Sequence, residues 1–227
     1  RLAIDAGCLG LAGLDVQNRV TDVVLTHAHL DHVATLPLYT VNRLQSEVAP
    51  ARIHAPADVL EVVRNDLFND RLWPDLERLS ENGPGLVEFH ELPTDSPTSV
   101  AGIDLVAVPV DHVVPTYGYL IGEPGCTVAV VTDTRDTHLI WERAAASDDL
   151  AGVLIETSFP DSQAELAHAT GHLTPTEVVR QLAKIGRDVR AIAVHLKPSS
   201  RDKLVAEIEA LESPVLEVGL PGTVYSF

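Results

Sequence analysis

Short apolar runs alternate with amphipathic segments along the whole chain, and each pattern predicts a different element. Runs rich in Val, Ile and Leu that are bounded by polar or turn residues predict strands. Segments that open with proline, a hydroxyl or an acidic residue predict helices. The expected strands span residues 2–5, 22–26, 52–54, 86–91, 103–110, 117–121, 127–132, 152–155 and 190–194, with a pair near 215 and 223. The expected helices follow Pro37, Pro56, Pro74, Asp136, Asp161, Thr174 and Ser199.

The order of these elements predicts the fold class. Strands dominate first, helices then intervene, and strands return near the end of the chain. This order fits an α/β protein with two sheets packed face to face and helices outside, a four-layer αβ/βα sandwich. The length of 227 residues suits a single domain over residues 1–227. Because the chain opens on Arg1 inside an expected strand, we expect N-terminal sequence to be missing, including any signal peptide.

The segment from His27 to His32 adds chemistry to this fold. A β-branched strand runs directly into four potential metal ligands within six residues, His27, His29, Asp31 and His32. Strand alternation points His27 and His29 to the same side, and Asp31 and His32 lie on the turn into the next helix. Imidazole nitrogen and carboxylate oxygen suit zinc first, with manganese or iron as alternatives. The competing reading is a chance surface cluster, but four ionisable groups at the end of a buried strand are costly without a counter-charge.

Three further candidate ligands follow strand-like runs elsewhere in the chain: His112, Asp133 and His195. Strand ends that gather on one edge of a sandwich are where convergent ligands are expected. Taken singly, each of the three could be an ordinary structural residue. Together with the first four, they predict a site for two metal ions. The remaining histidines of similar interest lack this setting and are predicted to be surface or core residues: His54, His90, His138 and His168.

The pattern resembles the metallo-β-lactamase superfamily over nearly the whole chain. The HxHxDH signature of that family is similar to His27-Ala28-His29-Leu30-Asp31-His32, and its later ligands match the three further candidates. The resemblance implies two divalent ions, Zn²⁺ first with Mn²⁺ or Fe²⁺ as alternatives. It also implies how the ligands divide between them. One ion would take His27, His29 and His112, the other Asp31, His32 and His195, with Asp133 as the bridge.

Within this superfamily the phosphodiesterase branch is the most similar. The stretch Thr132 to Arg135 resembles the Asp-Thr motif of the tRNA 3′-processing endonucleases. The stretches Glu156 to Pro160 and Gly171 to Pro175 resemble motifs of the class II cyclic-nucleotide phosphodiesterases, as does the region from Phe68 to Asp75. One departure is Asp111, which stands before His112 where that group commonly has a small serine.

The resemblance implies hydrolysis of a 3′,5′-cyclic nucleotide, such as cyclic AMP or cyclic GMP, to the 5′-monophosphate by a metal-bridging hydroxide. The implied catalytic residues are Asp31, Glu156 and His172, where His172 protonates the departing 3′-oxygen and Glu156 orients it. Phe68 and Trp73 are candidates for stacking on the base. The competing interpretation of these two aromatic residues is that they anchor a helix in the core.

Composition narrows the choice of partner. The chain has 16 basic and 33 acidic residues, a net charge of −17, and such a surface repels a polyanion. This disfavours long nucleic acid, and with it a tRNA-processing nuclease, relative to a small cyclic nucleotide. A thioester or lactone hydrolase on the same metals, or a non-catalytic metal-dependent sensor, are further alternatives. A homodimer is expected from the resemblance alone.

The same composition bears on location. The longest apolar runs fall well short of the roughly 18 residues that a membrane span needs, so no membrane partner is expected. Cys8 and Cys126 are the two cysteines and lie far apart in the sequence, so a disulfide framework is not indicated. This favours a reduced, cytoplasmic setting, with export left open by the missing N-terminus.

Overall fold

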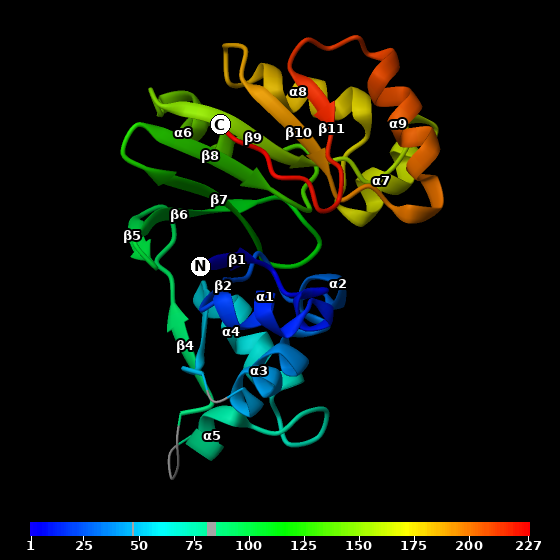
Figure 1. Ribbon diagram of the computed structural model, residues 1–227. Coiled ribbons are helices and arrows are strands. Elements are labelled where there is room, and N and C mark those ends of the chain that lie inside the picture. Colours follow the sequence, from blue (N-terminus) through cyan, green and yellow to red (C-terminus); the bar gives the residue numbers. More distant parts are fainter. Residues whose placement is uncertain (47, 81–84) are drawn as a thin grey trace. The chain divides into compact units, whose positions relative to one another are not determined.

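Two β-sheets organise the chain, which divides into two units (Figure 1). The computed structural model describes residues 1–46, 48–80 and 85–227. The first unit comprises residues 1–94 and 98–102, and the second comprises residues 95–97 and 103–227. The expected single domain over residues 1–227 stays a prediction.

The first unit holds a four-stranded sheet in which all neighbouring strands are parallel. Parallel strands cannot be joined by a tight hairpin, so helical segments make the connections. The strand order is β1 (Leu2–Ile4), β2 (Asp22–Val24), β3 (Ala51–Ala55) and β4 (Val87–Glu91). The helices are α1 (Leu14–Arg19), α2 (Leu30–Val33), α3 (Leu36–Gln45), α4 (Ala57–Val62), which continues into a π-helical turn over Val63–Leu67, and α5 (Leu76–Ser80).

The second unit contributes six strands to a mixed sheet of seven, and the seventh strand, residues 97–100, is divided between the two units. The order across the sheet is β11 (Leu216–Val218), β10 (Arg190–Val194), β9 (Leu150–Glu156), β8 (Cys126–Val131), β7 (Thr116–Glu123), β6 (Ile103–Val110) and β5 (Pro97–Val100). The strands β6, β7 and β8 pair antiparallel, and β8, β9, β10 and β11 pair parallel. The helices are α6 (Leu139–Ala146), α7 (Ala164–Thr170), α8 (Pro175–Ala183) and α9 (Arg201–Ala210).

The core of the second unit lies between its sheet and three of these helices. One face of the sheet contributes alternate buried residues such as Val153 and Ala193, as expected for a period of two. Helices α6, α8 and α9 cover that face with Trp141, Leu182 and Ile208 (Figure 1). This packing makes the sheet a rigid support, so the loops at its strand ends are held in fixed positions.

Most of the predicted elements are confirmed. All seven predicted helices are present, and α8 begins with the capping box that Thr174 and Glu177 predict. The strand expected near Thr223 is wrong, because residues 223–227 have no regular structure. Helix α1 and strand β5 were not predicted, since LDVQNR and PTSV carry too few apolar positions to show a period. Among the described residues, no helix combines the length and apolar character that crossing a bilayer requires.

Candidate metal centre

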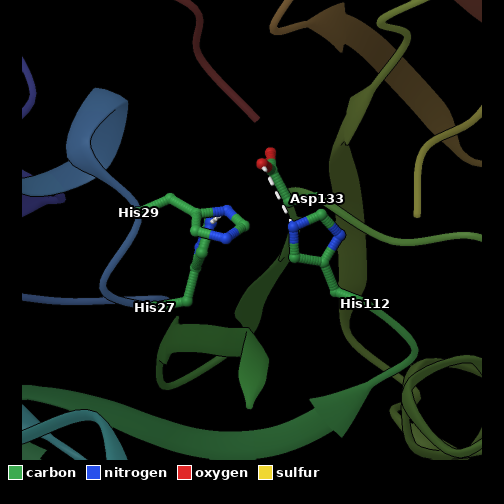
Figure 2. Close-up of side chains that lie close together, drawn as sticks. All are labelled: His27, His29, His112 and Asp133. Carbon is green, nitrogen blue, oxygen red and sulfur yellow. Dashed lines mark hydrogen bonds and ion pairs between the residues drawn. The ribbon is translucent and has the colours of Figure 1, made fainter. Parts of the chain in front are cut away.

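The end of β2 brings three imidazoles of the first unit together. The Nε2 of His27 and the Nδ1 of His29 lie 3.0 Å apart, and the two rings meet edge to face (Figure 2). The ring of His32 lies 4.1 Å from that of His27, centroid to centroid. The Oδ2 of Asp31 is 3.9 Å from the Nε2 of His32. The predicted cluster of four donors in this unit is therefore formed.

A carboxylate from β1 orients one of these rings. The Nδ1 of His32 donates to Oδ2 of Asp5 over 2.6 Å. Thr26 holds the same carboxylate twice, through its backbone N–H at 2.8 Å and its hydroxyl at 2.8 Å. A proton on Nδ1 leaves Nε2 as the ring nitrogen that can coordinate a cation, as is usual for histidine ligands supported by a carboxylate.

The loop after β1 also packs closely against the turn of the HxHxDH segment. A Cβ at Gly7 would lie 1.7 Å from the carbonyl oxygen of Asp31, so only glycine fits there. The neighbouring Ala6 donates its N–H to the carbonyl of His32 over 2.7 Å. The turn that carries Asp31 and His32 is therefore held by backbone contacts as well as by Asp5.

In the second unit, four site residues follow strands that run in the same direction. Strands β8, β9 and β10 are parallel, and β6 points the same way because two antiparallel steps separate it from β8. Their C-terminal ends share one edge of the sheet, where ligands of α/β proteins commonly bind. That edge carries His112, Asp133, Glu156 and His195.

Asp133 lies between two of these histidines. Its Oδ2 is 4.0 Å from the Nε2 of His112, and its Oδ1 is 3.5 Å from the Nδ1 of His195 (Figure 2 draws the first pair). The side chains of His112 and Asp133 are almost completely buried, and that of His195 is 22% exposed. A buried carboxylate between two imidazoles has the position expected of a shared ligand.

The backbone at this edge is strained. Asp133 and His195 adopt positive φ values of 51° and 58°, in the left-handed region that non-glycine residues rarely occupy. Such conformations cost on the order of 1 kcal/mol or more each and persist where the surroundings enforce them, most often at functional sites. Both residues with this backbone conformation are candidate ligands, and their side chains approach each other to 3.5 Å.

Partners from other segments set the ring orientation of His112 and His195. The Nδ1 of His112 donates to the carbonyl of Gly171 over 2.8 Å. The Nδ1 of His195 lies 2.9 Å from the hydroxyl of Ser158, which donates to the backbone carbonyl of His195 over 3.2 Å. Both arrangements place the proton on Nδ1 and leave Nε2 for coordination.

Glu156 and His172 form a buried pair beside these residues. The Nδ1 of His172 is 3.0 Å from Oε1 of Glu156, and that oxygen also accepts the N–H of Thr134 over 2.9 Å. Glu156 has no exposed surface and His172 is 7% exposed. The ring centroid of His172 lies 5.1 Å from that of His112. The pair that the sequence singled out is therefore formed and lies next to a candidate ligand.

The two aromatic candidates for base stacking have different surroundings in the first unit. Phe68 is 3% exposed and its ring packs edge to face on Phe89, at 5.8 Å between centroids. Trp73 is partly exposed, and its buried indole N–H lacks a hydrogen-bond partner among the described residues. Phe68 thus has the surroundings of a core anchor, and contact of either ring with a substrate stays a prediction.

Sequence reasoning missed the supporting residues Asp5, Ser158 and Gly171. Asp5 had a usable signal, because it directly follows the first apolar strand, as His112 and Asp133 follow theirs. Ser158 and Gly171 lie in stretches that resemble phosphodiesterase motifs, but their contacts with His195 and His112 had no local signal, since these partners lie 37 and 59 residues away in the sequence.

The donors present fit divalent metal ions. Every candidate offers an imidazole nitrogen or a carboxylate oxygen, the set that zinc and its first-row neighbours accept. His27 and Asp133 are 0% and 1% exposed, and burial of so many ionisable groups is costly unless a cation or other partner offsets it.

Known proteins share sequence with most of this chain. Residues 11–196 match the family described as Beta-lactamase superfamily domain. The chain is 26% identical over 214 residues to the "Probable 3′,5′-cyclic-nucleotide phosphodiesterase" of Yersinia pestis, covering 82% of this chain and 60% of that protein. It is 30% identical over 156 residues to the "Ribonuclease Z" of Mycobacterium bovis BCG, covering 65% of this chain and 54% of that protein.

Solved structures show the same fold. The crystal structure of unliganded yeast PDE1 superposes with a TM-score of 0.77 at 22% sequence identity, covering 91% of this chain and 68% of that one. The chain thus spans 60% and 54% of the lengths of the two relatives named above. With its two sheets, their flanking helices and the matched residues 11–196, the chain belongs to the metallo-β-lactamase superfamily.

Proposed function

We propose that this chain is a metal-dependent phosphodiesterase that hydrolyses 3′,5′-cyclic nucleotides to 5′-monophosphates. The observation that carries the proposal is the buried pair of Glu156 and His172 beside His112, because a phosphodiesterase needs a proton source next to its metal ligands. The similarity to two proteins named cyclic-nucleotide phosphodiesterases, from Yersinia pestis and yeast, supports the choice of substrate.

Seven side chains would hold the two divalent ions, with Zn²⁺ favoured by the donor set and Mn²⁺ or Fe²⁺ as alternatives. Support comes from each unit separately, since each gathers its own donors at the carboxyl end of parallel strands. The first ion would be held by His27, His29 and His112, the second by Asp31, His32 and His195, and Asp133 would bridge them.

When bound, two such ions lower the pKa of coordinated water towards about 7 and neutralise charge on the phosphoryl oxygens. The residues of the chain supply the remaining steps. The Nδ1–H of His172 is held by Glu156, so a protonated His172 donates from Nε2 to the departing 3′-oxygen as the P–O bond breaks. The carboxylate of Glu156 stabilises the imidazolium before the transfer and fixes its ring orientation afterwards.

A tRNA 3′-processing activity is the second candidate, because the chain also resembles mycobacterial ribonuclease Z at 30% identity. The net charge of −17 argues against it. A polynucleotide substrate gains most of its affinity from basic residues on the protein, whereas a cyclic nucleotide carries one phosphate. The charge therefore favours the small substrate.

A substrate panel separates these activities. Purified protein is stripped of metal, reloaded with Zn²⁺, Mn²⁺ or Fe²⁺, and assayed on cyclic AMP, cyclic GMP, bis-p-nitrophenyl phosphate, a thioester and a pre-tRNA. We expect two ions per chain by metal analysis and turnover of the cyclic nucleotides. The Asp133→Ala variant should lose metal and activity together. Cleavage of the pre-tRNA or the thioester alone would overturn the cyclic-nucleotide assignment.

A further inference from the structure

Arg135 links three segments of the second unit. Its backbone N–H donates to the carbonyl of Asp111 over 2.8 Å, and its Nε lies 3.2 Å from Oδ1 of the same residue. Its Nη1 donates to the carbonyl of His168 in the last turn of α7 over 3.2 Å. The side chain of Arg135 therefore contacts the segment after β6 and the last turn of α7. Its backbone belongs to the turn after β8.

Each of these contacts lies next to a residue of the candidate site. Asp111 precedes His112, and Arg135 follows Asp133 by two positions. The turn that follows His168 presents the carbonyl of Gly171 to the Nδ1 of His112 over 2.8 Å. Arg135 thus touches the segments that carry both candidate ligands and the hydrogen-bond acceptor that orients one of them.

Thr134 adds two hydrogen bonds to the same junction. Its hydroxyl lies 3.3 Å from the carbonyl of Asp111, and its N–H donates to Glu156 over 2.9 Å. The turn from Asp133 to Arg135 is therefore connected to the end of β6, to the end of β9 and to α7. A shift in this turn would move His112 and the Glu156–His172 pair together.

The carboxylate of Asp111 supplies the negative charge at this junction, and an uncharged residue such as serine could not form the ion pair with Arg135. The side chains of Arg135 and Asp111 are 26% and 53% exposed, and an ion pair this exposed adds little stability by itself. The contacts of Arg135 with the segments beside His112 and Asp133 are therefore the feature that bears on the site.

We infer that Arg135, paired with Asp111, is a positioning residue that fixes His112 in the ring orientation needed for metal binding and sets His172 relative to it. The expected effect on turnover rests on the proposed function. Partners that orient a metal ligand typically change metal affinity by about 10- to 100-fold when they are removed. Small displacements of catalytic groups lower turnover by comparable factors.

The test compares Arg135→Ala with Arg143→Ala. Arg143 forms a partly exposed pair with Asp95 at 2.6 Å in the same unit and contacts none of the site residues, so it is a matched control. We measure Zn²⁺ affinity of the metal-free protein by chelator competition, the tautomer of His112 by ¹⁵N NMR, and kcat and KM on cyclic AMP. Arg135→Lys and Asp111→Ser are measured alongside.

We expect Arg135→Ala to weaken Zn²⁺ binding about tenfold or more, to mix the His112 tautomers, and to lower kcat more than it raises KM. Arg135→Lys should recover part of the loss, because it keeps the charge without the planar fork. Asp111→Ser should cause a smaller loss in the same direction. Arg143→Ala should leave all three quantities unchanged.

Equal Zn²⁺ affinity and an unchanged His112 tautomer in Arg135→Ala and Arg143→Ala would overturn the positioning role. The Zn²⁺ titration and the NMR measurement need no substrate, so they decide on Arg135 even if the wild-type chain hydrolyses no cyclic nucleotide. Failure of the substrate panel would overturn the proposed function alone.

Discussion

The Nδ1 of His32 lies 2.6 Å from Oδ2 of Asp5, a contact that joins the end of β1 to the last residue of the HxHxDH segment. Asp5 leaves its strand with a φ of 59°, which turns its carboxylate toward β2. The backbone and hydroxyl of Thr26 hold that carboxylate in place. The first unit therefore supplies His32 with its ring orientation set by a second layer of hydrogen bonds.

Replacing Asp5 with Asn should test this support. The amide keeps the size of the side chain but removes the negative charge that faces the Nδ1–H of His32. We expect metal affinity to fall by roughly 10- to 100-fold, measured by chelator competition on the metal-free protein. Asp15→Asn is the control, because Asp15 pairs only with Arg19 on the surface. Equal affinities in the two variants would show that Asp5 does not tune His32.

Replacing His172 with Ala should separate catalysis from metal binding. Loss of a general acid lowers turnover by about 10²- to 10⁴-fold. Metal content should stay at the wild-type level, since His172 is not among the proposed ligands. Glu156→Gln should cause a smaller loss of turnover, because the imidazolium loses its counter-charge. A His172→Ala variant with wild-type turnover would remove the proton-donor assignment.

Gly171→Ala should disturb His112 directly. Gly171 has a φ of +79°, and an added Cβ would lie 2.5 Å from the Nδ1 of His112. Gly186 has a φ of +77° with nothing within 4 Å of such a Cβ, so Gly186→Ala introduces the same backbone strain without a steric clash. Both variants should lose about 1 kcal/mol of stability in urea titrations. Only Gly171→Ala should weaken Zn²⁺ binding, and equal binding in both variants would contradict the packing argument.

Asp22 should make stability depend on pH in the acid range. Burial raises the pKa of this carboxyl, but hydrogen bonds from Arg52, Thr21 and His54 outweigh burial and hold the pKa well below the ordinary value of 3.8. Because the pKa of Asp22 is lowered in the folded state, its ionised carboxylate stabilises the fold above about pH 4. This contribution is lost as the pH falls further. Asp22→Asn should therefore destabilise the chain at pH 7.

We expect a loss of about 2 kcal/mol in the free energy of unfolding at pH 7, less than for a fully buried pair because Arg52 can reach water. The difference between Asp22→Asn and the wild type should shrink in urea titrations at pH 3. The control is Asp95→Asn, whose ion pair with Arg143 is more exposed. A difference that stays constant from pH 7 to pH 3 would show that the charge of Asp22 is not the stabilising feature.

Much of this protein could be predicted from local patterns. Alternating apolar positions located nearly all strands, and the proline and capping signals located seven helices, because both depend on residues close in sequence. The cluster of candidate ligands that follows β2 could be predicted for the same reason, because its residues are close in sequence. The later candidates His112, Asp133 and His195 could be chosen because each follows an apolar run, and parallel strands end at a common edge.

Tertiary structure decided the contacts that make these residues a site. The partners of His32, His195 and His112 lie 27, 37 and 59 residues away, and no local pattern encodes those hydrogen bonds. The same holds for the left-handed backbone at Asp133 and His195, which only the surrounding packing enforces. The sequence determined which residues are available as donors, and chain packing decided how their rings and carboxylates are oriented.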